Sequence, residues 1–226
     1  MKRARAWHTA TLLVTVAALV LQVVLVVNGA AVLGQAHVPP LGTRLLRLFS
    51  FFTIQSNIAV AAASWMLVRD PAADSPGFRV LRLDAVVAIT VTGLVHWFLL
   101  RPLLTLTGAN ALVDTLLHVV VPLFAIVGWL LFGPRPRTSR STIGLALSWP
   151  VLWLAYTLIM GALTGWYPYP FIDVGQLGYP RTLLNAGGVT ALFVLLFALA
   201  GLLDRRLPAR PRPTSARPSA DHQRPA

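Results

Sequence analysis

Residues 45–68 read LLRLFSFFTIQSNIAVAAASWMLV, a largely apolar run long enough to cross a lipid bilayer as an α-helix. Four polar residues interrupt its middle: Thr53, Gln55, Ser56 and Asn57. Such side chains need hydrogen-bonding partners within the protein, because the hydrocarbon of a bilayer offers none. The stretch therefore predicts a membrane-spanning helix whose polar residues face a cavity enclosed by other helices.

The composition of the whole chain is typical of a membrane protein. Hydrophobic residues make up 56% of the 226 residues, charged residues only 12%, and the mean hydropathy is +0.70. Soluble domains usually carry about 25% charged residues. We therefore expect an integral protein of the cell membrane that has the lipid bilayer as its surroundings. The net charge of +12 comes from residues between the apolar runs and in the tail, so it indicates topology and not a nucleic-acid partner.

Six apolar runs predict an all-α bundle of six transmembrane helices within residues 1–203. The predicted helices cover about 7–31, 44–68, 83–100, 111–132, 143–163 and 183–203. The first run is longer than the apolar core of a signal peptide, so we expect it to span the membrane. Residues 204–226 are rich in Arg, Pro and Ala and predict a disordered, basic, Pro-rich cytoplasmic tail.

The distribution of basic residues predicts the orientation of the bundle, because cytoplasmic loops carry more Lys and Arg than external ones. If the N-terminus is cytoplasmic, only four basic residues fall in external segments, namely Arg44, Arg47, Arg101 and Arg181. The cytoplasmic loops hold Lys2, Arg3, Arg5, Arg69, Arg79, Arg82, Arg135, Arg137 and Arg140, and the tail adds further arginines. Both termini are therefore expected on the cytoplasmic side.

Polar residues of three predicted helices fall at similar depths. Thr53 comes nine residues after Arg44 and His118 eight residues after Asn110, so both lie roughly 12 to 14 Å below the outer boundary of the membrane. His96, on the helix between them, lies at roughly 8 Å. We therefore expect these side chains to share one layer of the outer leaflet.

Helical spacing adds neighbours to this layer. Asn57 follows Thr53 by four residues and shares its helix face, and Asp114 precedes His118 by four and can contact its ring. An Asp within a membrane helix is costly and usually lines a cavity or a pathway. Structural roles are the alternative: Thr53 can bond its own helix, His96 can bridge two helices, and Asp114 can cap a helix start.

Three segments carry a resemblance to a known family: FTIQSN at 52–57, LHVVVPLF at 117–124 and WYPYPFID at 166–173. Together they resemble the androgen-induced, androgen-dependent family of multi-pass membrane proteins, over roughly residues 44–203, and the chain is similar to bacterial relatives of that family. The resemblance implies a membrane-embedded threonine hydrolase that cleaves esters of fatty acids with hydroxy fatty acids. It also implies that Thr53 is the nucleophile, that His118 is its base, and that a membrane lipid or fatty-acid ester is the substrate.

The chemistry of these residues is consistent with that role. A Thr hydroxyl attacks a carbonyl only if a base removes its proton, and His is the usual base near neutral pH. Asn57 or Ser56 would donate to the oxyanion, Asp114 would fix the tautomer of His118, and His96 would support the pair. A site in the outer leaflet would admit an acyl chain sideways from lipid.

The external segment 166–180 is predicted to cover the mouth of the cavity as a lid. It is rich in aromatic residues and proline, and we assign Trp166, Tyr167, Tyr169 and Asp173 to the cavity or its lid. The alternative is that these aromatic residues form only an interfacial belt.

Two other function classes remain open at the level of sequence. The first is a non-catalytic lipid-binding or scaffold protein in which the polar layer holds a head group or water. The second is a haem protein with His96 and His118 as axial ligands. The preferred hydrolase hypothesis requires no metal and no cofactor.

Overall fold

The computed structural model describes residues 2–30 and 38–208, and in this part of the chain the regular elements are helices without a strand. Five helical segments are long and apolar enough to cross a membrane, and a sixth is obtained if the bent pair α2–α3 is one span. The α-helices are α1 (Lys2–Val27), α2 (Leu41–Ser50), α3 (Phe52–Arg69), α4 (Pro76–Val95), α5 (Gly108–Thr115), α6 (Val121–Phe132), α7 (Arg140–Thr164) and α8 (Val174–Arg206).

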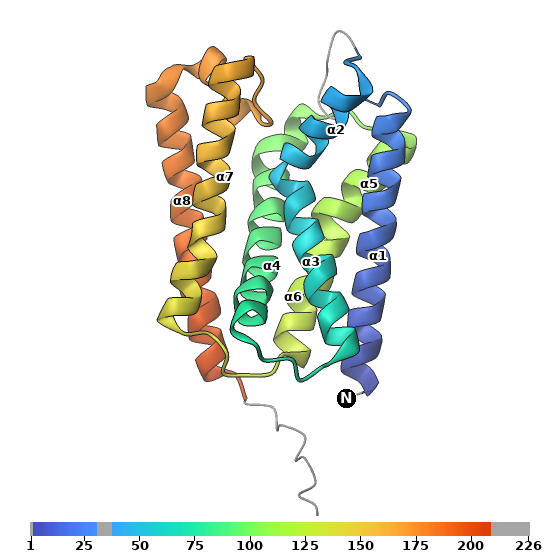
Figure 1. Ribbon diagram of the computed structural model, residues 1–226, viewed down its shortest axis with the longest axis vertical. Coiled ribbons are helices and arrows are strands. Elements are labelled where there is room, and N and C mark those ends of the chain that lie inside the picture. The colour runs from blue at the N-terminus through green and yellow to red at the C-terminus, as the bar shows by residue number, and fades with distance from the viewer. Residues whose placement is uncertain (1, 31–37, 209–226) are drawn as a thin grey trace, which may run out of the picture.

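The helices run alternately up and down the long axis of the molecule (Figure 1). Helix α4 is central, because it packs against α3, α6, α7 and α8. Helices α7 and α8 form a hairpin on one side of it, and α1 packs against α3 and α6 on the other. The N-terminal end of α1 and the C-terminal end of α8 lie at the same end of the bundle (Figure 1).

The predicted helix at 44–68 is interrupted at Phe51. Its backbone is extended there (φ −66°, ψ 129°), and α2 and α3 are bent by 68° relative to each other. The bend leaves backbone carbonyls without partners within the helix, and side chains donate hydrogen bonds to them. Gln55 Nε2 donates to Phe49 O at 3.0 Å, and Trp153 Nε1 donates to Ser50 O at 2.9 Å. Thr53 therefore lies in the first turn of α3, and a depth counted along one straight helix from Arg44 does not apply to it.

Both site histidines lie in π-helical turns. The turn η1 (His96–Leu100) follows α4 directly and leads into the 3₁₀ turn η2 (Arg101–Leu103), and the turn η3 (Leu116–Val120) joins α5 to α6. A π-turn inserts an extra residue into the helix and shifts the direction of the side chains, and it is frequent at functional sites.

Several helices begin earlier than the apolar runs predicted, because polar residues cap them. Ser75 Oγ accepts a hydrogen bond from Phe78 N and starts α4, and Ser139 Oγ accepts one from Thr142 N and starts α7. Asp173 caps α8 in the same way through Gln176 N. Helix α4 begins seven residues before the predicted helix at 83–100, and α7 begins three residues before the predicted helix at 143–163. The segment that Asp173 caps is separated from the predicted helix at 183–203 by a kink at Gly178, whose backbone is not helical (φ 70°, ψ 160°).

The last helix extends three residues beyond the predicted end of the bundle at residue 203. Helix α8 continues to Arg206, because the carboxylate of Asp204 accepts hydrogen bonds from the backbone N–H groups of Arg137 and Thr138, at 2.6 and 2.7 Å. These contacts attach the end of α8 to the loop before α7. The rest of the predicted tail, from residue 209, lies outside the described residues, as do residues 31–37 after α1.

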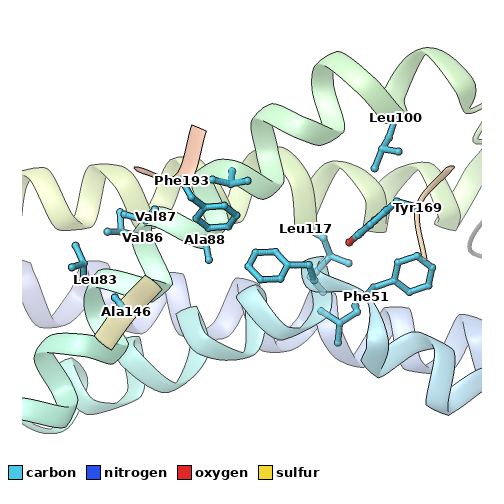
Figure 2. Close-up of a cluster of buried hydrophobic side chains, with 14 of the residues drawn as sticks. Phe51, Leu83, Val86, Val87, Ala88, Leu100, Leu117, Ala146, Tyr169 and Phe193 are labelled. Carbon is cyan, nitrogen blue, oxygen red and sulfur yellow. The ribbon is translucent and has the colours of Figure 1, made fainter. Parts of the chain in front are cut away.

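The apolar core extends along α4 and reaches the polar layer. Figure 2 shows buried residues of several helices in one cluster, which ends beside Phe51, Leu117 and Tyr169. Tyr169 belongs to the loop between α7 and η4 (Pro170–Ile172) and directs its hydroxyl inward between these neighbours. The polar layer is therefore enclosed by hydrophobic side chains.

Candidate active site

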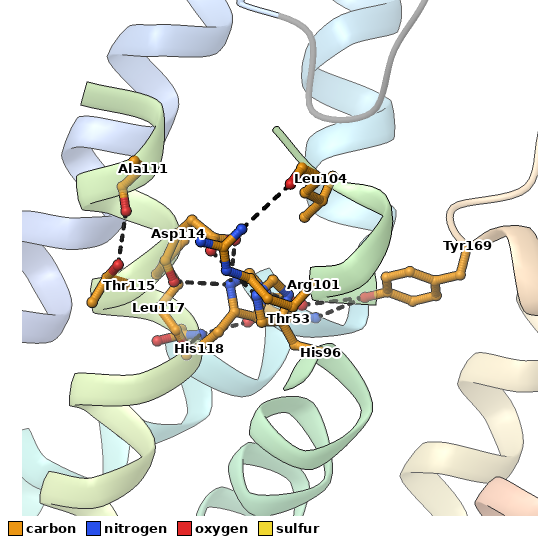
Figure 3. A network of polar contacts seen from close by, with 11 residues as sticks. Thr53, His96, Arg101, Leu104, Ala111, Asp114, Thr115, Leu117, His118 and Tyr169 are labelled. Atoms are coloured by element: carbon orange, nitrogen blue, oxygen red, sulfur yellow. Dashed lines mark hydrogen bonds and ion pairs between the residues drawn. The ribbon is translucent and has the colours of Figure 1, made fainter. Parts of the chain in front are cut away.

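Thr53 and His118 face each other across the interior of the bundle (Figure 3). The hydroxyl Oγ1 of Thr53, in the first turn of α3, lies 3.2 Å from Nε2 of His118 in η3. The Thr53 side chain is buried, with 8% of its surface exposed. The two residues expected to form the dyad are thus within hydrogen-bonding distance, at a site largely shielded from solvent.

The other ring nitrogen of His118 is held by Asp114. Nδ1 lies 3.0 Å from the backbone oxygen of Asp114 and 3.1 Å from its carboxylate Oδ1. Both of these atoms are acceptors, so the hydrogen bonds assign the proton to Nδ1. This leaves the lone pair of Nε2 directed at the Thr53 hydroxyl, which is the tautomer that a general base requires.

His96 completes the polar cluster from η1. Its ring stacks on that of His118, with centroids 3.7 Å apart and planes inclined by 13°, and its Nε2 lies 3.2 Å from Oδ2 of Asp114. His96 is 3% exposed. The Asp114 carboxylate therefore bridges two stacked imidazoles and restricts the ring orientation of both.

The ligand atoms of His96, Asp114 and His118 lie within 4.8 Å of one another, close enough to consider a metal ion. Lone pairs of an imidazole lie in the plane of the ring, and in two stacked rings they run side by side and do not converge on one point. A metal held by both rings would need one of them to turn out of the stack. The contact between the two rings also leaves no space for a porphyrin between them, so the geometry does not fit the haem hypothesis.

Ser56 and Asn57, expected as donors to an oxyanion, make their hydrogen bonds to backbone carbonyls and to Thr92. Ser56 Oγ lies 3.0 Å from both Thr53 O and Thr92 Oγ1, and Asn57 Nδ2 donates to Thr53 O at 2.8 Å and to Leu117 O at 3.4 Å. Both side chains are fully buried. They connect α3 to α4 and to η3, and so they stabilise the packing that positions Thr53.

The Tyr169 hydroxyl lies beside Thr53, in the position where Ser56 or Asn57 was expected to donate to an oxyanion. It lies 3.3 Å from Thr53 Oγ1 and accepts a hydrogen bond from Thr53 N at 3.2 Å. Burial raises the pKa of the Tyr169 hydroxyl above its ordinary value, so it stays protonated. The sequence analysis assigns Tyr169 to the cavity or its lid without a contact to Thr53, because the spacing within an irregular loop does not indicate where a side chain points.

The remaining residues of the predicted lid lie around the mouth of the site or support it. The ring of Trp166 packs edge-on against Phe51 and is covered by the guanidinium of Arg47, 5.1 Å from the ring centroid. Tyr167 packs so closely over α7 that a Cβ at position 161 would overlap its ring unless the ring moved. Asp173 caps α8 and does not reach the reacting pair.

Thr53 lies between two cavities. One, with an empty volume of about 770 Å³, is lined mainly by apolar residues of α4, α7 and α8. The other, of about 670 Å³, contains His96, Asp114, His118 and further polar residues from α1 and α5. Thr53, Leu100 and Tyr169 line both cavities, so a molecule that extends from one to the other would pass the Thr53 hydroxyl.

The arrangement combines a hydroxyl, a base in the required tautomer and a carboxylate that orients the base, all within an apolar enclosure. Groups of these kinds are the ones used for nucleophilic attack on a carbonyl carbon. Comparisons of the chain with protein-family models, with curated proteins and with solved structures found no match, so the function is argued from this geometry.

Proposed function

We propose that the protein is a membrane-embedded ester hydrolase in which Thr53 is the nucleophile, His118 its general base and a lipid ester the substrate. The observation that carries the proposal is the 3.2 Å contact between Thr53 Oγ1 and His118 Nε2, with His118 Nδ1 bound to Asp114. The resemblance of the surrounding segments to a family of threonine hydrolases supports the same assignment.

The reaction follows from the positions of the protons. His118 Nε2 accepts the proton of Thr53 Oγ1 as the oxygen attacks the ester carbonyl, which gives a tetrahedral oxyanion. The protonated His118 then gives this proton to the departing alcohol, and Thr53 is left acylated. A water molecule, activated by the same nitrogen, cleaves the acyl-enzyme and releases the carboxylic acid.

Tyr169 supplies the best-placed donor for the oxyanion. Its hydroxyl lies beside Thr53 Oγ1, and its raised pKa keeps the proton available for donation. The backbone N–H of Thr53, which has no partner within the helix, donates to this hydroxyl at 3.2 Å and so holds it beside Thr53 Oγ1. Fixed donors of this kind act strongly where water is excluded.

Asp114 and His96 orient the base in this mechanism. The carboxylate keeps the proton of His118 on Nδ1, and the stacked His96 ring stops the His118 ring from rotating. The apolar surroundings favour a lipid over a water-soluble ester, since burial of its hydrocarbon contributes to binding.

A non-catalytic lipid-binding or scaffold role is the alternative, and one observation favours it. Part of the polar layer serves helix packing, because the side chains of Ser56, Asn57 and Thr92 form hydrogen bonds with one another or with backbone carbonyls. That role would require lipid binding without turnover.

The test compares alanine substitutions in purified protein. Thr53→Ala and His118→Ala are each expected to abolish hydrolysis of a lipid ester, and Thr53→Ala to abolish covalent labelling by a fluorophosphonate probe. Thr115→Ala is the matched control, because Thr115 lies next to η3 and its hydroxyl bonds only to Ala111 O. Undiminished labelling of the Thr53→Ala protein would reject the nucleophile assignment, and lipid binding without hydrolysis by the wild type would favour the scaffold role.

A further inference from the structure

A further cavity lies toward the end of the bundle opposite to Thr53. It has an empty volume of about 320 Å³ and is lined by α1, α3, α4 and α6, near the ends of these helices that lie beside the start of α1 and the end of α8 (Figure 1). Ser64, which lines it, comes eleven residues after Thr53 on α3, or roughly 16 Å along the helix axis. The cavity is therefore separate from the candidate active site.

Three hydrophilic side chains line this cavity among apolar neighbours. They are His8 from α1, Ser64 from α3 and Arg82 from α4, with 5%, 5% and 8% of their surfaces exposed. Among the described residues, no protein group forms a hydrogen bond with the side chain of His8 or of Ser64. Buried polar groups are normally hydrogen-bonded, so these two side chains offer donors to a ligand in the cavity.

Arg82 brings a positive charge to the cavity, and this charge has few partners. A guanidinium has five N–H donors, but within the described part of the chain only Nη1 of Arg82 donates, to Pro134 O at 3.5 Å, and Nη2 is buried without a partner. The carbonyls of Trp129 and Leu130 at the end of α6 accept hydrogen bonds from Arg135, which is also buried and adds a second positive charge. A buried cation without compensating hydrogen bonds is costly, and a bound anion would remove that cost.

Carboxylates at this end of the bundle are engaged by other groups. Asp74 forms ion pairs with two other arginines, and Asp204 accepts two hydrogen bonds from backbone N–H groups before α7. Asp84 lies two residues after Arg82 and therefore on another face of α4. For the residues that the structure describes, Arg82 thus has no carboxylate as an ion-pair partner.

The donors of the cavity match the acceptors of a phosphate group. A guanidinium binds phosphate oxygens through paired, charge-assisted hydrogen bonds, and a serine hydroxyl and an imidazole N–H are suitable additional donors. The excess of Arg and Lys predicts that this end of the bundle is cytoplasmic. Basic pockets between transmembrane helices on that side of a membrane commonly bind the head groups of anionic lipids.

We propose that this cavity is an anion site in which Arg82 binds a phosphate group, with His8 and Ser64 as additional donors. The phosphate belongs to the head group of an anionic phospholipid or is free inorganic phosphate, since both present the oxygens that a guanidinium recognises. A bound phosphate would connect α1, α3 and α4 and stabilise the folded state. The inference does not depend on the proposed hydrolase function, because binding is measured without turnover.

Thermal unfolding of the purified full-length protein in detergent measures this binding. Sodium phosphate is compared with sodium chloride of equal ionic strength, and mixed micelles with phosphatidylglycerol are compared with those containing phosphatidylcholine. A ligand that binds only the folded state raises Tm, and we expect a rise of about 3 °C or more from at least one of the two phosphate sources at saturation. A rise with inorganic phosphate shows that the free ion binds, and a rise with phosphatidylglycerol alone shows that the site requires the lipid.

Arg82→Gln should abolish this rise. Arg79→Gln is the matched control, because it removes the same charge from the same helix, and Arg79 pairs with Asp74 outside the cavity. Its Tm should rise by the wild-type amount. Ser64→Ala is a smaller change that keeps the test open if Arg82→Gln does not fold, and it should raise the ligand concentration at half of the maximal rise by about threefold or more.

Two results would overturn the proposal. One is a wild-type Tm that is equal in phosphate and chloride and also equal in the two kinds of mixed micelle. The other is a rise in Tm that persists at the wild-type size and midpoint in Arg82→Gln, or in Ser64→Ala where Arg82→Gln does not fold, because the phosphate would then bind elsewhere on the protein.

Discussion

Asp114 determines the state of the candidate catalytic pair, because one carboxylate serves two histidines. Oδ1 lies 3.1 Å from His118 Nδ1 and Oδ2 lies 3.2 Å from His96 Nε2. An ionised carboxylate accepts hydrogen bonds through both oxygens, so each ring presents an N–H to it. His118 then has its free lone pair on Nε2, at the Thr53 hydroxyl. In the proposed mechanism, the direction of proton transfer is therefore set by Asp114, which hydrogen-bonds to His118 and not to Thr53.

At the residue scale, we predict that removal of the Tyr169 hydroxyl lowers kcat. Tyr169→Phe keeps the ring that packs against Phe51 and Phe171 but removes the hydroxyl beside Thr53. Loss of an oxyanion donor typically lowers kcat by about 10²- to 10³-fold, and we expect a fall of this order with a smaller change in KM. Steady-state kinetics of lipid-ester hydrolysis, compared between the variant and the wild type, measure the changes in kcat and KM.

Tyr179→Phe is the control for this change, because Tyr179 is 58% exposed. It should keep the wild-type kcat. A Tyr169→Phe enzyme with unchanged kcat would mean that the oxyanion is stabilised by other groups.

At the scale of elements, the site depends on a close approach between α4 and the π-turn η3. Gly93 lies where the two meet: a Cβ at this position would be 3.1 Å from the backbone oxygen of His118 and 3.5 Å from the ring of Pro122. One turn further along, His96 stacks on His118. The absence of a side chain at Gly93 thus allows the two imidazoles to meet.

Gly93→Val is expected to separate α4 from η3. The added methyl groups would press on a backbone carbonyl and a proline ring, neither of which moves easily, and overpacking of this kind costs about 1 to 3 kcal/mol. Thermal unfolding in detergent should show a lower Tm, and hydrolysis should fall as His118 moves. Gly187→Val is the matched control, because a Cβ at Gly187 meets no atom within 4 Å. Equal Tm values for the two variants would contradict the role of Gly93.

At the scale of the whole molecule, the described ends of the chain and the site lie at opposite ends of the bundle. The N-terminal end of α1 and the C-terminal end of α8 lie at one end (Figure 1), and the polar layer lies near the end that carries α2 and α5. Two ends on the same side fit an even number of membrane crossings. The excess of Arg and Lys at the end with the termini then predicts that this end is cytoplasmic and that the site opens toward the outside.

Cysteine labelling tests this orientation, and the chain contains no cysteine that would interfere. Thr105→Cys, in the exposed segment before α5, should react in intact cells with a maleimide that does not cross membranes. Gly77→Cys, exposed at the start of α4, should react only after the cells are permeabilised. The reverse pattern would show that the site faces the cytoplasm.

The alignment of Asp114 with His118 illustrates what could be predicted from sequence. Residues four apart on a helix share a face, and this local rule holds across the π-turn, since the Asp114 carboxylate contacts His118 Nδ1. The same rule identified Asn57 as a neighbour of Thr53 but did not show that its amide bonds the Thr53 and Leu117 carbonyls. Local spacing predicts which residues are neighbours, whereas the direction of a donor depends on the elements that surround it.

The sequence by itself determined the helical, apolar character of the bundle and the approximate positions of its long helices. These features depend on composition and on the 3.6-residue repeat, which are local properties of the chain. The tertiary structure alone decided the bend at Phe51, the stack of His96 on His118, the place of Tyr169 at Thr53 and the two cavities that meet there. Each of these arises from contacts between segments far apart in the chain, whose packing no local pattern specifies.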